Sequence, residues 1–98
     1  PHVSRFNLIA KMSRFADIAV AMGENIDGLS IRDAADVAIE AIQTLSADIG
    51  IPSGLAALGV KEKDLQIMAE NAQKDACGLT NPRCPSLEEV IGIYKNAL

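Results

Sequence analysis

The longest regular pattern in this chain of 98 residues is a run of apolar residues between Ser30 and Gly50. The run repeats at intervals of four and three residues, which keeps its side chains on one side of a helix for about five turns. Ser30 can cap the first turn, and Gly50 followed by Pro52 prevents the helix from continuing. The predicted stripe is Ile31, Ala35, Ala38, Ile42, Leu45 and Ile49, with Arg32, Asp36, Glu40 and Gln43 facing away.

Three further segments have apolar residues at the same helical spacing. Their stripes are Phe15, Ile18, Ala19 and Met22 before Gly23; Leu65, Met68, Ala69, Ala72 and Ala76 before Gly78; and Leu87, Val90, Ile91, Tyr94 and Leu98 at the end of the sequence. We expect helices over these segments, the second running from Lys61 to Ala76, and a short helical turn over 53–58. A capping box, Ser86-Leu87-Glu88-Glu89, opens the last helix. Residues 79–85 are predicted to be extended or turned, because prolines interrupt them.

The composition also favours helices packed closely on one another. Apolar residues make up 49% of the chain, yet aromatic residues contribute only 3%, so the core must be built from Ala, Ile, Leu, Val and Met. Alanine has the highest helix propensity, and the aromatic residues that favour strands are nearly missing. The sequence therefore predicts an all-α helical bundle, formed by residues 1–98 as a single domain without an internal boundary.

The charge of the chain bears on its partners. The formal net charge is −4, which argues against binding to nucleic acid or to an anionic membrane, since both require a basic surface. No segment has the roughly 20 successive apolar residues of a membrane span, and no leader sequence is recognisable. We expect a cytoplasmic protein without nucleic-acid or membrane partners.

The sequence contains no complete catalytic motif. A metal site needs three or four ligands, whereas the only histidine is His2, for which we expect a partly buried or frayed position. No glycine-rich phosphate-binding motif is present. Cys77 and Cys84 are expected to be free thiols, and Cys77, which lacks a histidine nearby in the sequence, is expected to pack rather than to act as a nucleophile. Asn81-Pro82-Arg83 is expected to be a rigid turn whose guanidinium ties helix ends together, or clamps a carboxylate or phosphate.

Six segments together resemble the C-terminal end of iron-containing alcohol dehydrogenases. The resemblance covers essentially all 98 residues, and it is greatest to the propanediol, lactaldehyde and ethanol dehydrogenase group. The matching segments are Pro1-His2-Val3-x-Arg5-Phe6-Asn7, Phe15 to Ala19 closing on Met22-Gly23, Leu45-x-x-Asp48-Ile49-Gly50-Ile51-Pro52, Leu58-Gly59-Val60-Lys61, Lys74-Asp75-Ala76-Cys77 and Asn81-Pro82-Arg83.

The resemblance implies the C-terminal portion of the helical domain that iron alcohol dehydrogenases share with dehydroquinate synthase-like proteins. In such enzymes an N-terminal α/β domain binds NAD(P), and the helical domain holds iron or another divalent metal. The metal acts as a Lewis acid on the substrate oxygen while hydride passes to or from the nicotinamide. The parent would thus interconvert a small alcohol with an aldehyde or ketone, and we expect it to be a homo-oligomer.

The family's glycine-rich cofactor segment and its metal ligands, one aspartate and three histidines, all lie upstream of the equivalent of Pro1. His2 matches a later histidine that is not a ligand. The resemblance therefore implies that these residues alone bind neither metal nor cofactor and are inactive. It places Cys77 on the wall of the substrate pocket and gives Asn81 and Arg83 a structural role.

Two other interpretations remain open from the residues themselves. The apolar stripes could belong to a free-standing helical module that binds a partner helix, and the two cysteines could form a redox sensor. We also expect the isolated chain to associate with itself, because about half of its residues are apolar and few are large.

Overall fold

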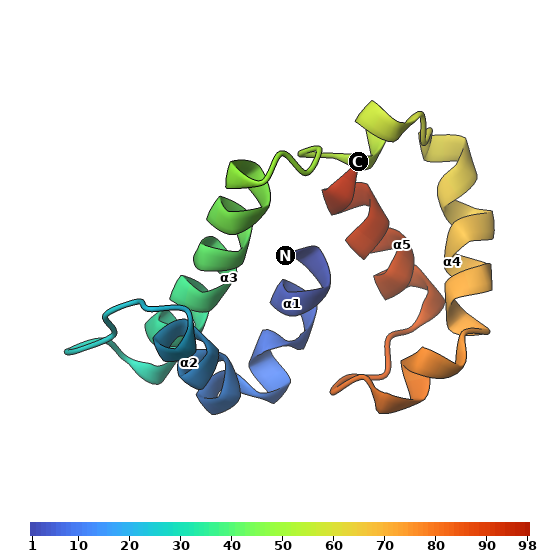
Figure 1. The fold of residues 1–98 in the computed structure, drawn as a ribbon. Coiled ribbons are helices and arrows are strands. Elements are labelled where there is room, and N and C mark those ends of the chain that lie inside the picture. The colour runs from blue at the N-terminus through green and yellow to red at the C-terminus, as the bar shows by residue number, and fades with distance from the viewer. The chain divides into compact units, whose positions relative to one another are not determined.

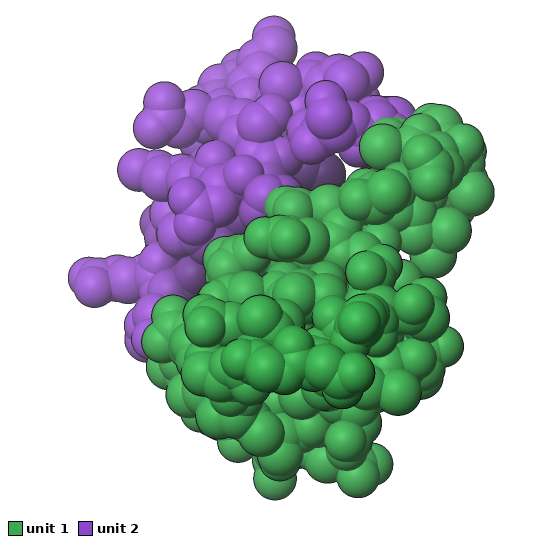
Figure 2. Space-filling view, turned by 90° about the vertical axis from the view of Figure 1, so that its left-hand side faces the viewer, with its two compact units in different colours: residues 1, 3–51 green, residues 2, 52–98 purple.

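The computed structural model describes all residues from 1 to 98 and contains helices and no strand, which confirms the predicted all-α class (Figure 1). The chain divides into two compact units, residues 1 and 3–51 and residues 2 and 52–98 (Figure 2). The prediction that residues 1–98 form one domain therefore stays a prediction. None of the helices combines the length and the apolar character that a membrane span requires.

The first unit contains three α-helices and one short 3-10 helix: α1 (His2–Asn7), η1 (Leu8–Ala10), α2 (Met12–Ala21) and α3 (Ile31–Asp48). The predicted cap of α3 is confirmed, because the hydroxyl of Ser30 accepts a hydrogen bond from the backbone N–H of Asp33 at 3.1 Å. Gly23 and Gly50, which follow α2 and α3, have φ of 88° and 78°. These are left-handed values that glycine adopts without steric cost, so both glycines end their helices as predicted.

The core of this unit lies between α2 and α3, which pack against each other. Its buried members are Leu8, Phe15, Ala19, Ala35, Ala38 and Ile39, with Met12, Ile26 and Val37 packed against them. Three of the six are alanines, whose small side chains allow the two helix axes to approach closely. The many alanines of the sequence thus serve to pack α2 closely against α3.

The predicted stripe of α3 is correct in its middle and wrong at its ends. Ala35 and Ala38 are fully buried, whereas Ile31, Leu45 and Ile49 are 56%, 50% and 64% exposed. The reason is length: α2 has 10 residues and α3 has 18, or about 15 Å against about 27 Å. The shorter helix cannot cover the longer one.

Two further predictions for this unit need correction. Asp36 does not face away into solvent, because its carboxylate is half-buried and bonds to the guanidinium of Arg5 at 2.8 Å and lies 3.8 Å from that of Arg32. Ile18, predicted to lie in the buried stripe of α2, is 39% exposed. Periodicity predicted which residues share a helix face, but it did not predict where a neighbour covers that face.

The second unit contains η2 (Leu55–Leu58), η3 (Glu62–Asp64), α4 (Leu65–Gln73), η4 (Ala76–Thr80) and α5 (Leu87–Ala97). The helix predicted over 61–76 is wrong at its C-terminal end, because α4 stops at Gln73 and Gly78 lies inside η4. Asp75 is extended, with φ −72° and ψ 128°, and its carboxylate caps η4. A capping side chain competes with helix continuation, so the chain turns here instead.

The predicted capping box of α5 is confirmed in both directions. The hydroxyl of Ser86 accepts from the N–H of Glu89 at 3.2 Å, and the carboxylate of Glu89 accepts from the N–H of Ser86 at 2.9 Å. Helices α4 and α5 pack against each other. Of the predicted stripes, however, only Leu65, Ala69 and Val90 are buried, and Ala76 is exposed.

The last residue of the chain lies against the short turn that follows the division between the units. The carbonyl of Leu98 accepts from the N–H of Ala56 at 3.1 Å. A Cβ added at Gly54 would lie 2.7 Å from that carbonyl oxygen. Glycine is therefore required here by close approach of two backbone segments and not by a positive φ.

Candidate functional site: the connection between α4 and α5

Cys77, the residue expected to line a substrate pocket, lies on η4 in the connection between α4 and α5. Its side chain is exposed, so the expectation that it packs into a core is wrong. The cause is again the end of α4 at Gln73, which removes Cys77 from that helix. The backbone N–H of Cys77 donates to the Asp75 carboxylate at 2.8 Å, and its carbonyl accepts from the Thr80 hydroxyl at 3.1 Å. Both contacts hold the backbone and leave the thiol facing outward.

The Asp75 carboxylate also shifts the pKa of this thiol. A hydrogen bond to the Asp75 carboxylate, and then its negative charge, raise the pKa of the Cys77 thiol above its ordinary value. Conversely, hydrogen bonds from the backbone and side chain of Cys77 lower the pKa of Asp75. A raised pKa keeps the thiol neutral near pH 7, whereas a nucleophilic or redox-active cysteine needs a lowered one. The surroundings of Cys77 thus favour the neutral thiol over the thiolate.

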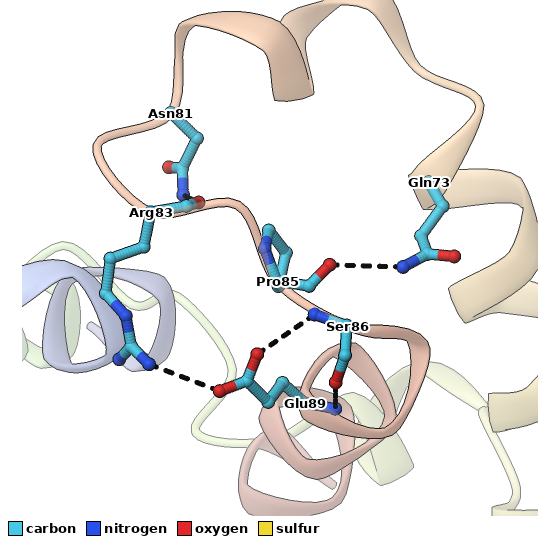
Figure 3. Close-up of polar contacts among 6 residues, drawn as sticks. All are labelled: Gln73, Asn81, Arg83, Pro85, Ser86 and Glu89. Atoms are coloured by element: carbon cyan, nitrogen blue, oxygen red, sulfur yellow. Dashed lines mark hydrogen bonds and ion pairs between the residues drawn. The ribbon is translucent and has the colours of Figure 1, made fainter.

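Arg83 ties the same connection to the first turn of α5, as Figure 3 shows. Its guanidinium lies 3.2 Å from the carboxylate of Glu89, the residue that also closes the capping box. The side-chain amide of Asn81 donates to the carbonyl of Arg83. The expected role of this turn in tying helix ends together is therefore seen in the structure.

A further contact fixes the connection to the end of α4. The side-chain amide of Gln73, the last residue of α4, donates to the carbonyl of Pro85 at 3.2 Å (Figure 3). The C-terminal part of the connection is thus held by polar contacts to both helices, from Pro85 to α4 and from Arg83 to α5. Such contacts position the connection without burying its outward-facing residues.

The sequence did not single out Leu79, which lies two residues after Cys77. It is 89% exposed, the largest value among the exposed large apolar side chains. Cys84, on the other side of Asn81, is also exposed and free. The connection therefore exposes apolar and weakly polar side chains to solvent. Its apolar character could have been noticed in the sequence, but its exposure depends on where α4 ends.

The residues present do not fit a metal site. No group of three or more His, Cys, Asp or Glu side chains comes together that could hold a metal ion. His2, the only histidine, is the first residue of α1 and is partly buried. Its partly buried position agrees with the expectation from the sequence.

Comparison with known proteins decides the family. The family described as Fe-containing alcohol dehydrogenase, C-terminal, matches residues 1–98. This chain belongs to the Fe-containing alcohol dehydrogenase family. The resemblance inferred from six short segments is confirmed over the whole chain.

Relatives in the Fe-containing alcohol dehydrogenase family are similar to this chain along its whole length. It is 57% identical to the 1,3-propanediol dehydrogenase of Citrobacter freundii, over 99% of this chain and 25% of that protein. It is 50% identical to the NAD-dependent methanol dehydrogenase of Bacillus methanolicus, over all of this chain and 26% of that protein. The chain thus spans about a quarter of the length of these relatives.

Solved structures of the family agree. A crystal structure of a 1,3-propanediol oxidoreductase matches all of this chain and 26% of its own, with a TM-score of 0.98 and 55% identity. Such a match identifies the fold as that of the C-terminal helical domain of the Fe-containing alcohol dehydrogenases.

Proposed function

We propose that this chain is the C-terminal helical part of an iron-dependent alcohol dehydrogenase that interconverts an alcohol with an aldehyde or ketone by hydride transfer to or from NAD(P). The match of the family over residues 1–98 carries the proposal. The names of two relatives, a 1,3-propanediol dehydrogenase and an NAD-dependent methanol dehydrogenase, support small alcohols as substrates and NAD as the acceptor.

Within that enzyme these residues act as a scaffold. They do not fit a metal site, and we propose that the iron and the nicotinamide nucleotide are bound by other parts of the polypeptide. What this chain contributes is two packed helix pairs, α2 with α3 and α4 with α5, and a connection between α4 and α5 that polar contacts tie to both helices. We further propose a cytoplasmic homo-oligomer.

Cys77 is the residue of this chain that we place on the wall of the substrate pocket. Its exposure supports this placement, because an accessible side chain of low polarity suits contact with the carbon chain of a small alcohol. Asp75 and Thr80 hold the backbone of Cys77 and so set the position of the thiol. In this role Cys77 contacts substrate without exchanging a proton with it.

The full-length product of the gene that encodes this chain tests the proposal. It should reduce NAD in the presence of 1,3-propanediol or methanol after reconstitution with Fe²⁺, and lose that activity on chelation. A polypeptide containing only residues 1–98 should show no turnover and serves as the control. A native gene product of 10.4 kDa, the mass of this chain alone, without turnover would contradict the proposal and favour a helical interaction module.

The placement of Cys77 has its own test in the full-length enzyme. Cys77→Leu should raise the KM for 1,3-propanediol and leave the KM for NAD unchanged, because the larger side chain narrows only the alcohol pocket. Cys84→Leu is the matched control, since Cys84 is also exposed and lies in the same connection. Equal effects of the two substitutions on the KM for the alcohol would contradict the placement of Cys77.

A further inference from the structure

The segment that joins α2 to α3 contains an aspartate followed directly by a glycine, Asp27-Gly28. The N–H of Leu29 donates to the carbonyl of Ile26 at 3.1 Å, so Asp27 and Gly28 are the two central residues of a four-residue turn. Gly28 has φ of 77°, and no residue other than glycine has a positive φ. These signs identify a type II turn, in which the third residue needs a positive φ. The turn thus requires the small residue that follows Asp27.

Two groups in this turn can react with each other, and neither is engaged elsewhere. The carboxylate of Asp27 forms no hydrogen bond or ion pair, and the backbone N–H of Gly28 donates no hydrogen bond. Both residues are exposed. A Cβ built at Gly28 would meet nothing within 4 Å, so the space around the amide nitrogen is open. The nitrogen of Gly28 is therefore free to approach the side chain of Asp27.

Asp75, the other exposed aspartate with extended neighbours, differs in both respects. Its carboxylate accepts a hydrogen bond from the N–H of Cys77 at 2.8 Å. The residue that follows it is Ala76, whose Cβ stands beside the amide nitrogen and hinders its approach to a side chain. Asp75 is thus a natural comparison for Asp27 within the same chain.

We infer that Asp27 is a modification site at which aspartate converts to isoaspartate without an enzyme. The backbone nitrogen of Gly28 attacks Cγ of the protonated Asp27 carboxyl. A C–N bond forms, the C–O bond to the hydroxyl breaks, and the hydroxyl leaves as water with the amide proton. Water then adds to either carbonyl carbon of the five-membered succinimide, the C–N bond at that carbon breaks, and a proton returns to the nitrogen. Opening at the former backbone carbonyl gives isoaspartate, opening at the other carbonyl restores aspartate, and no atom is oxidised or reduced.

The turn restrains this reaction only weakly. A type II turn sets ψ of its second residue near about +120°, and the ring closes after the peptide between Asp27 and Gly28 rotates away from that angle. The rotation breaks one backbone hydrogen bond, from Leu29 to Ile26. The bond from the N–H of Asp27 to Oδ1 of Asn25, at 2.9 Å, lies on the other side of the rotating bond. Exposed turns open locally at low cost, and glycine tolerates the new backbone angles.

Incubation of the full-length gene product in H₂¹⁸O at neutral pH tests the inference, because each opening of the succinimide leaves one ¹⁸O atom on residue 27. Peptide mass spectrometry should find about tenfold more ¹⁸O at Asp27 than at Asp75, since only Asp27 is followed by a residue without a Cβ. Electron-transfer fragmentation should place isoaspartate at the same position. Equal labelling of the two aspartates in the native protein would overturn the inference.

Asp27→Glu is the matched variant. It keeps the charge but would need a six-membered ring, so both the ¹⁸O label and the isomer should be lost at position 27. Isomer that persists in the same peptide of this variant would contradict the assignment to Asp27. The protein unfolded in urea provides a second comparison, and label at Asp27 in urea but none in the native protein would show that the turn prevents the reaction. The inference goes beyond the proposed function, and none of these measurements uses turnover.

Discussion

The two units of this chain are stabilised in different ways. In the first, α2 and α3 bury a cluster that includes Phe15, Ala38 and Ile39. In the second, only three apolar residues are buried, and the ends of the helices are held by hydrogen bonds and ion pairs such as Arg83 with Glu89 and Lys95 with Glu62. Exposed ion pairs contribute little. We therefore expect the stability of the first unit to depend mainly on the volume of its buried side chains. The stability of the second unit should depend mainly on helix caps and on close contacts between backbone segments.

The largest effect should come from the core of the first unit. Ile39→Ala removes a side chain that is 0% exposed, and a buried deletion of this kind costs about 2–5 kcal/mol. Ile31→Ala, on the same helix at 56% exposure, should cost under about 1 kcal/mol. Urea unfolding followed by far-ultraviolet circular dichroism measures both, and similar losses would show that the first unit does not depend on its core.

The next largest loss of stability should come from the close contact between backbone segments at Gly54 in the second unit. Gly54→Ala places a Cβ 2.7 Å from the carbonyl oxygen of Leu98, and relieving such an overlap costs about 1–3 kcal/mol. Gly92→Ala is the control, because nothing lies within 4 Å of its added Cβ and alanine in a helix is about 1 kcal/mol more favourable than glycine. The midpoint temperature of thermal unfolding should therefore fall for Gly54→Ala and rise for Gly92→Ala. A change of the same sign would contradict the close contact at Gly54.

The caps of the two long helices sharpen the contrast further. Ser86→Ala removes the cap of α5, at a loss of about 1 kcal/mol. Ser30→Ala removes the cap of α3, where the side chain of Asp33 returns no bond in a capping box. We expect the smaller loss of stability at Ser30, since more of the stability of the first unit comes from its core. Urea midpoints of the two variants provide the measurement, and a larger loss for Ser30→Ala would refute the contrast between core and caps.

The smallest effect concerns the Cys77 thiol and changes reactivity more than stability. Asp75→Asn removes the carboxylate that raises the pKa of Cys77, so the pKa should fall and a larger fraction should be thiolate at pH 8. Maleimide labelling of Cys77 should then be faster than in the unsubstituted protein. Cys84 in the same molecule is the internal control, and an equal increase at both cysteines would indicate general loosening of the connection.

The sequence determined the class of fold, the family and several of the residues at which helices begin and end. The caps at Ser30 and Ser86 and the stops at Gly23 and Gly50 are visible in the sequence because each depends on groups only a few residues apart. A role for Arg83 in tying helix ends together was likewise predicted from the sequence, but its partner in the first turn of α5 was not.

Burial was decided only by the tertiary structure. The stripe of α3 is continuous in the sequence from Ile31 to Ile49, but α2 is shorter and covers only its middle. Similarly, Cys77 and Leu79 are exposed because the capping bond of Asp75 takes the chain out of the helix after Gln73. Periodicity defines which side chains share a face, whereas burial depends on the length and position of another element, which no local pattern contains.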